Sequence, residues 1–252
     1  MIRLSLPALI LCAQCLPAGL SAAPQPESEW TAAGRTLAGK MCRQALPENS
    51  EFAGVLQVRK PKAKPTVILL QVRTQVTATN WQTIYAAHRT NQSQALRLTV
   101  IHTDEQPNAY CLRWTPPSPG EPDQGERLTG NAAMVPFANT DFWLFDLGLE
   151  FFHWPNQRIV KKEMRRGRFC EVLESVNPHP APGAYARVLS WIDQETGGLL
   201  RAEAYDPAGR LLKEFSVGSF KKINGQWHLR DMEIRNEQTS SRTRLELDLH
   251  TE

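Results

Sequence analysis

The stretch TDFWLFDLGLEFFHWP, residues 140–155, decides how the rest of the sequence is interpreted. It holds six of the chain's twenty aromatic residues, although the mean hydropathy of the whole chain is negative, at −0.40. At helical spacing, Asp146, Glu150 and His153 form one narrow polar stripe, and Asp141 stands at the N-cap position. A helix that is apolar around most of its circumference must be buried on more than one side, or occupy a groove that other molecules can also occupy.

Two interpretations of this predicted helix follow, and they are compatible. In the first, the helix fills the core of a curved β-sheet, as most apolar stripes do. In the second, it lines and covers a cavity for lipid. Gly148 in its middle weakens a helix by about 1 kcal/mol relative to alanine. We therefore predict that Gly148 allows the helix to bend or lift from the groove.

Short β-branched runs flank this stretch on both sides, and no helical pattern lies between successive runs. Glycine-containing turns such as 195–198 and 206–209 separate several of them, as tight hairpins require. This arrangement predicts an antiparallel meander, preceded by one amphipathic helix over 27–44. The predicted strands are 52–60, 66–76, 80–89, 95–103 and 109–114, then 169–176, 185–193, 199–206, 210–217, 226–236 and 243–250.

The N-terminus has the pattern of a secretory signal peptide over residues 1–23, with Arg3, a short apolar run and small residues at 21–23. The apolar run is too short and too interrupted to span a bilayer. Residues 24–252 are long enough for one domain with a sizeable core. We therefore expect a single-domain, soluble, monomeric protein of the bacterial periplasm.

Charge and cysteine content exclude several classes of protein. A net charge of +3 is too small to indicate a nucleic-acid-binding domain. Three cysteines follow the signal peptide, Cys42, Cys111 and Cys170, and their wide spacing excludes CxxC zinc or redox motifs. Cys111 and Cys170 each lie in a predicted strand. If one disulfide forms, we therefore expect it to join these two residues.

The remaining candidate sites favour a binding protein over an enzyme. The basic run KKEMRRGR, 161–168, is typical of a protected sheet edge, or alternatively contacts lipid phosphates. The histidines have no metal-binding spacing and GxSxG is absent, so we predict no metal site, no cofactor and no catalytic residue. A nucleophile pair of Cys170 and His153 is the remaining enzymatic alternative.

Several ordered motifs resemble the LolA-like outer-membrane lipoprotein-sorting family, over residues 52–247. They are Thr140-Asp141-Phe142 through Asp146-Leu147, Arg168 with Cys170–Ser175, Ser190–Asp193, Tyr205-Asp206 with Gly209, Leu212-Lys213, Met232 and Thr243. The resemblance is to the broad, mostly uncharacterised branch of that family. Trp143-Leu144 and Leu199 depart from the common pattern, so the resemblance implies the fold but not the cargo specificity of its relatives.

The resemblance implies a mainly β, α+β fold: a strongly curved antiparallel sheet, an unclosed half-barrel whose concave apolar face is partly covered by helices. It further implies a carrier that binds the acyl chains of lipids or lipoproteins and exchanges them with membrane-bound donor and acceptor proteins. The alternative is a periplasmic sensor or adaptor that uses the same groove without transport. The predicted lipid-binding residues are Phe142, Trp143, Phe145, Leu149, Phe151, Phe152 and Trp154.

Overall fold

The computed structural model describes residues 28–44, 50–77, 80–89, 95–103, 106–115, 125–223 and 226–248. The predicted signal peptide, 1–23, lies outside the described residues. Among the described helices, none has the length and apolar character needed to cross a membrane.

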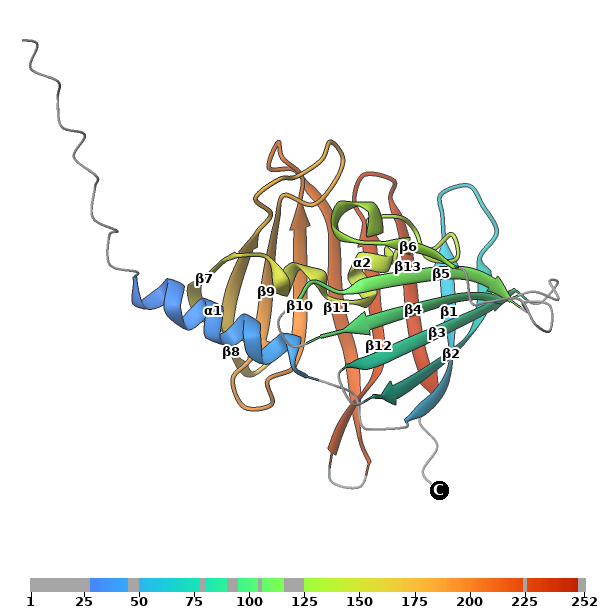
Figure 1. Ribbon diagram of the computed structural model, residues 1–252, viewed down its shortest axis with the longest axis horizontal. Coiled ribbons are helices and arrows are strands. Elements are labelled where there is room, and N and C mark those ends of the chain that lie inside the picture. The colour runs from blue at the N-terminus through green and yellow to red at the C-terminus, as the bar shows by residue number, and fades with distance from the viewer. Residues whose placement is uncertain are drawn as a thin grey trace, which may run out of the picture.

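Within the described residues, thirteen strands form one antiparallel sheet in the order β6-β5-β4-β3-β2-β1-β13-β12-β11-β10-β9-β8-β7 (Figure 1). Strands that follow one another along the chain pair with each other, except β6 and β7, and β1 also pairs with β13 and thereby joins the two arms of the sheet. The strands are β1 Glu51–Arg59, β2 Thr66–Val76, β3 Trp81–Arg89, β4 Ala95–His102, β5 Ala109–Thr115, β6 Glu126–Leu128, β7 Asn156–Arg165, β8 Arg168–Val176, β9 Arg187–Asp193, β10 Leu199–Tyr205, β11 Leu211–Ile223, β12 Gln226–Asn236 and β13 Ser241–Asp248.

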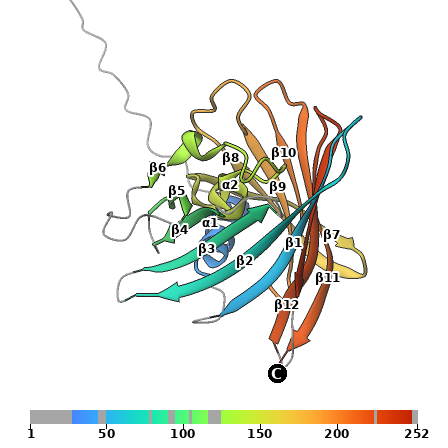
Figure 2. The same ribbon diagram turned by 90° about the vertical axis from the view of Figure 1, so that its right-hand side faces the viewer.

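The sheet is strongly curved and does not close, because β6 and β7 end the strand order at opposite edges. Figure 2 shows helix α2, Leu144–Leu147, between the two arms of the sheet. The predicted mainly β, unclosed half-barrel is therefore confirmed. Sequence periodicity missed the short β6 and all of β7, neither of which is among the predicted strands.

Alternation along each strand determines which face is apolar. On β2, Ile68, Leu70 and Val72 are buried, whereas Val67 and Leu69 point to the opposite face and are about half exposed. The buried set belongs to one continuous core on the concave side of the sheet, as expected for antiparallel strands with one solvated face. The basic run 161–168 lies on the edge strand β7 and its turn to β8, so its prediction as a sheet edge is confirmed.

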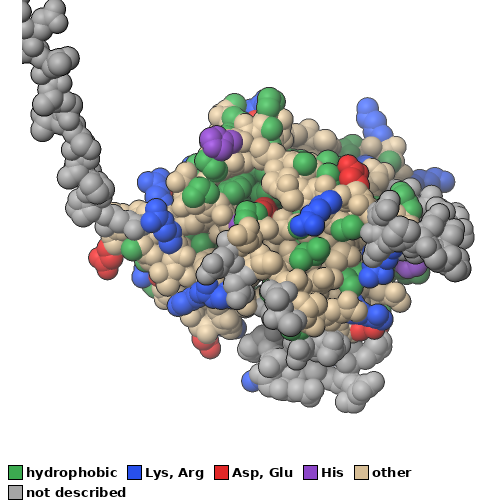
Figure 3. Space-filling view, viewed as in Figure 1, with side chains coloured by type: hydrophobic (Ala, Val, Ile, Leu, Met, Phe, Trp, Pro, Cys, Tyr) green, Lys and Arg blue, Asp and Glu red, His purple; other side chains and the backbone are tan. Residues whose placement is uncertain are grey.

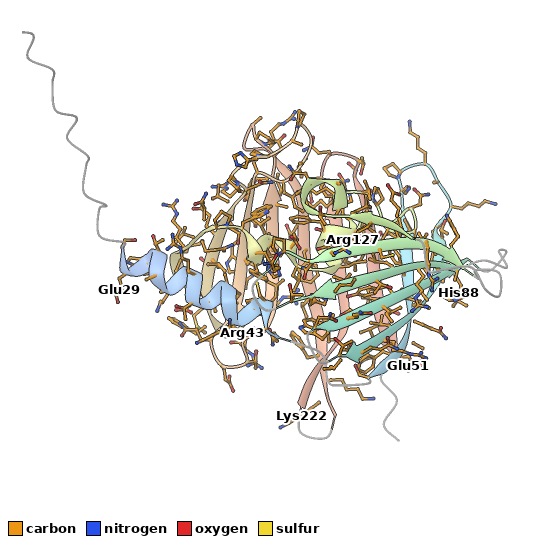
Figure 4. All side chains as sticks on the ribbon, in the orientation of Figure 1. Glu29, Arg43, Glu51, His88, Arg127 and Lys222 are labelled. Carbon is orange, nitrogen blue, oxygen red and sulfur yellow. The ribbon has the colours of Figure 1, made fainter. Side chains whose placement is uncertain are left out.

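The predicted N-terminal helix is present as α1, Glu29–Cys42, with the Ser28 hydroxyl accepting from the Thr31 backbone N–H. Figure 4 labels Glu29 and Arg43 at the two ends of this helix. Between them, α1 packs against strands β7 and β8. Its buried face consists of Gly34, Ala38 and Met41, whereas Trp30 near its start is half exposed. Gly34 is required to be small because the helix backbone at this point lies against the β7 backbone at Arg158.

The prediction of one continuous helix between Asp141 and Pro155 is wrong. The segment 137–154, which we call the plug, contains only two short turns, α2 and the 3-10 helix η2, Glu150–His153. Leu149 separates them in the left-handed region, with φ 49°. Asp141 is not an N-cap: its carboxylate accepts from the hydroxyls of Ser241 and Thr243 on β13.

All three cysteines of the described chain, Cys42, Cys111 and Cys170, are free. The preferred disulfide pair therefore does not form in this structure. Cys111 is on β5 and Cys170 on β8, close to opposite edges of the sheet. Cys170 also packs with Val172 and Trp191 in a small separate cluster rather than in the main core.

Two glycines of α1 allow a matched test of this packing. A Cβ added at Gly34 would lie 2.5 Å from the Arg158 Cα atom, so Gly34→Ala must displace the helix from β7 and should destabilise by about 1–3 kcal/mol. A Cβ at Gly39 would meet only the Arg43 side chain, at 3.5 Å. Gly39→Ala should therefore be neutral, or stabilise by up to about 1 kcal/mol. Thermal unfolding of both variants tests this, and equal losses would contradict the close helix–strand contact.

Candidate functional site

A cavity of about 640 Å³ lies between the plug and the concave face of the sheet. Ligand pockets in proteins typically measure about 300–1,000 Å³, so the cavity has the size of a binding site. Its wall draws residues from α1, both arms of the sheet and the plug. Its apolar wall residues include Met41, Phe52, Val72, Trp81, Phe142, Leu147, Leu149, Phe152, Leu199, Phe215, Val217, Leu229, Met232, Leu245 and Leu247.

The cavity exists because the plug covers only part of a long concave surface. Val72 on β2 and Met232 on β12 belong to different arms, and the curvature of the sheet brings both to the same cavity. On the face crossed by α1, the space-filling view shows hydrophobic side chains gathered around a hollow beside that helix (Figure 3). The chain therefore retains apolar surface that is neither filled by its own core nor dispersed over the exterior.

The predicted lipid-binding residues divide into two groups. Phe142, Leu149 and Phe152 line the cavity. The other four lie behind that wall: Phe145 packs against Phe151, Trp154 and Tyr185, while Trp143 stacks on Tyr185 with ring centroids 4.6 Å apart.

Sequence reasoning missed the wall residues that the strands contribute. Phe215, Met232 and Leu245 come from three neighbouring strands, and Trp81 and His102 come from the other arm. Strand alternation does place such residues on the apolar face. It does not reveal which of them the plug leaves uncovered.

Side chains of the sheet hold the irregular backbone of the plug in place. The Tyr85 hydroxyl donates to the Leu147 carbonyl at 3.1 Å, and the Asn108 amide donates to the Gly148 carbonyl at 2.8 Å. The Gln157 amide donates to the carbonyls of Phe151 and Trp154, both at 2.9 Å. Carbonyls without a regular helical partner need such donors when they are buried, so these contacts fix the plug rather than release it.

A buried lysine forms the most polar of these attachments. The Lys213 amine donates to the Asp141 carbonyl at 2.7 Å and pairs with the Asp146 carboxylate at 3.1 Å. It also lies 3.6 Å from the centre of the Trp143 ring, and the Tyr185 hydroxyl donates to Asp146 at 2.9 Å. Burial lowers the pKa of Lys213 to about 8, although Asp146 opposes that shift.

Gly148 does not lie in the middle of a continuous helix, because α2 ends at Leu147. A Cβ added at this position would lie 2.2 Å from the Tyr110 hydroxyl oxygen, so glycine permits a close approach between the plug and β5. The steric requirement explains the glycine without invoking motion of the plug.

A second cluster of polar groups lies beside the cavity and consists of Tyr110, Asn108 and Glu150. Glu150, which is only 3% exposed, accepts from the Tyr110 hydroxyl and from the Asn108 backbone N–H, both at 3.1 Å. Burial raises the pKa of Glu150 from 4.5 to about 7, against the effect of those two donors. On the cavity wall, burial lowers the pKa of His102 to about 4, and its ring stacks on Trp81 at 3.6 Å.

These groups do not form a metal site or a recognisable catalytic pair. Among the described residues, no group of three or more His, Cys, Asp or Glu side chains is placed to hold a metal ion. The thiol of Cys170 is packed with Val172 and Trp191, and burial raises its pKa, which disfavours the nucleophilic thiolate. The site is therefore best described as an apolar binding cavity with a few neutral or ion-paired polar groups.

Comparison with known families assigns the chain to one of them. Residues 122–250, just over half of the sequence, match the model of a family described as "uncharacterized protein". The chain belongs to that family. No curated protein matches the sequence.

Solved structures resemble the protein over most of its length. A DUF1329 family protein from Desulfovibrio piger has a TM-score of 0.69 at 18% identity, over 88% of this chain and 92% of that chain. A domain from Vibrio parahaemolyticus, described as an outer-membrane lipoprotein-sorting protein, has a TM-score of 0.69 at 17% identity, over 87% and 92% of the two chains. A LolA superfamily protein from Nitrosomonas europaea has a TM-score of 0.61 at 16% identity, over 86% and 91%. The resemblance to LolA-like proteins is thus confirmed for the fold.

The buried Glu150 generates a pH test of this site. Its folded-state pKa lies above its ordinary value, so its contribution to stability is present below pH 4.5 and is lost as the pH rises through 7. Relative to Glu150→Gln, the wild type should therefore lose up to about 3 kcal/mol of unfolding free energy between pH 4.5 and pH 8. His102 and His153 titrate in both proteins, so their effects cancel in this difference. Denaturant unfolding at several pH values measures it, and a difference independent of pH would contradict the buried environment.

Proposed function

We propose that the protein is a periplasmic carrier that binds acyl chains of lipids or lipoproteins and takes part in outer-membrane lipoprotein sorting. The observation that carries the proposal is the apolar cavity of about 640 Å³ that remains beside the plug. Transfer of apolar groups from water into such a space contributes about 0.8 kcal/mol for each buried methylene, so a chain of several methylenes binds without any specific polar contact.

The polar groups of the wall are consistent with an apolar ligand. Asp146 is paired with Lys213, and Arg168 is paired with Asp193 at 3.2 Å. The low pKa of His102 keeps this imidazole uncharged near neutral pH. These pairings leave the wall of the cavity largely without net charge, which favours hydrocarbon over a charged small molecule.

The fold relatives support the class of cargo. The Vibrio domain is described as a lipoprotein-sorting protein, and the Nitrosomonas protein belongs to the LolA superfamily. From this likeness we infer that residues 24–252 form a single carrier domain, exported by the signal peptide at 1–23, that acts as a monomer without catalysing a reaction. Membrane-bound donor and acceptor proteins would then load and unload it.

The attachments of the plug determine how cargo binds in this proposal. Because Tyr85, Asn108, Gln157 and Lys213 hold the plug backbone, the acyl chain enters the existing cavity and does not displace the aromatic core. Phe142, Leu149 and Phe152 contact the chain directly. Trp143, Phe145, Phe151 and Trp154 support that wall from behind.

Filling the cavity tests the proposal. Met232 lies on the wall, and Met232→Trp should occupy space that the ligand needs without adding charge. Displacing only two methylenes of ligand costs about 1.6 kcal/mol, so affinity for a fluorescent fatty-acyl probe should fall at least tenfold.

Leu69→Trp is the matched control, because Leu69 is 51% exposed on the outer face of β2. It should leave affinity unchanged, and melting temperatures should show that both variants are folded. Equal binding by the folded Met232→Trp variant would refute the cavity as the acyl site. If the wild type and the Leu69→Trp control both fail to bind acyl chains, and a stable protein partner co-purifies with the wild type, the sensor or adaptor function replaces the carrier function.

A further inference from the structure

The turn between β7 and β8 exposes an unusual combination of side chains. Met164 and Phe169 face each other in the strand register and are 61% and 48% exposed. Arg165 and Arg168 form the next pair, and Arg166-Gly167 makes the turn itself, with positive φ at both residues. Figure 2 shows this hairpin projecting from the sheet beside β11, where an Arg166 guanidinium N–H donates to the Val217 carbonyl at 2.6 Å.

Protection of a sheet edge accounts for only part of this arrangement. Lys161 and Lys162 are paired with Glu163 and Glu171, at 2.8 and 3.0 Å, which is typical of a solvated edge strand. An exposed Met–Phe pair is what such an edge normally avoids, because unpaired apolar edges promote association. The apolar pair at the tip therefore calls for a different explanation.

The charges beside that pair carry both signs. Arg168 is paired with Asp193 and with the exposed Glu195, at 3.2 and 3.0 Å, so among the described residues of the tip the cations that carry no such pairing are Arg165 and Arg166. Within the described part of the chain, Arg165 and Arg166 contact the Trp191 ring and the Val217 carbonyl, respectively, and neither is ion-paired with a carboxylate. Exposed apolar side chains flanked by arginines are typical of surfaces that lie in the interface of an anionic bilayer. A neutral or cationic partner surface would not complement them.

We propose that the tip of the β7–β8 hairpin, residues 164–169, docks on the surface of an anionic lipid bilayer. Met164 and Phe169 enter the boundary between headgroups and acyl chains, while Arg165 and Arg166 contact lipid phosphates.

The position of the tip connects it with the cavity. Arg168 and Asp193 belong to the cavity wall, and they also line an adjoining shallow recess together with Met164 and Phe169. Docking at the tip therefore brings this end of the cavity next to lipid. The docking itself requires only the hairpin. The proposal is therefore independent of which ligand the cavity binds.

Vesicle flotation of the chain isolated from expressing cells tests the proposal. We expect binding to vesicles of phosphatidylethanolamine with phosphatidylglycerol, weakening with added salt, and little binding to phosphatidylcholine alone. The double variant Arg165→Gln/Arg166→Gln should weaken binding by about 25-fold, since each cation near such a surface contributes roughly fivefold. Met164→Ser/Phe169→Ser should weaken it as well.

The turn between β1 and β2, together with the outer face of β2, provides a matched control, because the turn carries exposed lysines and that face carries the exposed Leu69. The variant Lys62→Gln/Lys64→Gln/Leu69→Ser removes the same kinds of group at another site and should bind within about twofold of the wild type. Tip variants that bind like the wild type would overturn the proposal, as would a control variant that loses as much. Binding of the acyl probe, measured on the same variants, should be unchanged, which separates this result from a failure of the carrier function.

Discussion

An open sheet with one apolar face must cover that face, and the rest of this structure follows from how the cover is held. The concave surface runs from β5 through β13 to β8 and presents buried side chains along most strands. The plug supplies the aromatic cover, with Phe142, Phe145, Phe151 and Phe152 all at most 4% exposed. The plug is shorter than the surface it covers, and the uncovered remainder is the cavity.

The cover is fixed by polar contacts rather than by helical regularity. Lys213 contacts both Asp141 and Asp146, and Asp141 in turn accepts from two hydroxyls of β13, so the plug is attached to the arm that β11 to β13 form. Tyr85 and Asn108 attach it to the other arm. A buried ion pair gives limited net stability, but removing one partner leaves a costly unpaired charge. This arrangement specifies one position for the plug and so defines the shape of the cavity.

The strands were predictable because period-two alternation and glycine turns are local signals. On β2, the residues 66–76 carry the complete pattern, and the structure reproduces it. The conformation of the plug was not predictable from period alone, since it depends on contacts such as Tyr110 against Gly148 and Thr243 with Asp141. These partners are 38 and 102 positions apart in the sequence. Helical spacing correctly indicated a buried apolar segment, and tertiary contacts then overrode its helical propensity.

The same distinction applies to the candidate site. The aromatic stretch identified Phe142, Leu149 and Phe152, but the opposite wall consists of residues such as Phe215 and Met232 that look like ordinary core positions in the sequence. Only the curvature of the sheet separates strand residues that meet the plug from those that face the cavity.

Native mass spectrometry of the protein isolated from expressing cells tests the central claim most directly. The account predicts a population carrying one lipid or acyl adduct, which Met232→Trp reduces and which the exposed-face variant Leu69→Trp retains. A protein that carries no lipid, and that acquires none when incubated with phospholipid or acylated peptide, would contradict the claim that the cavity is an acyl-chain site.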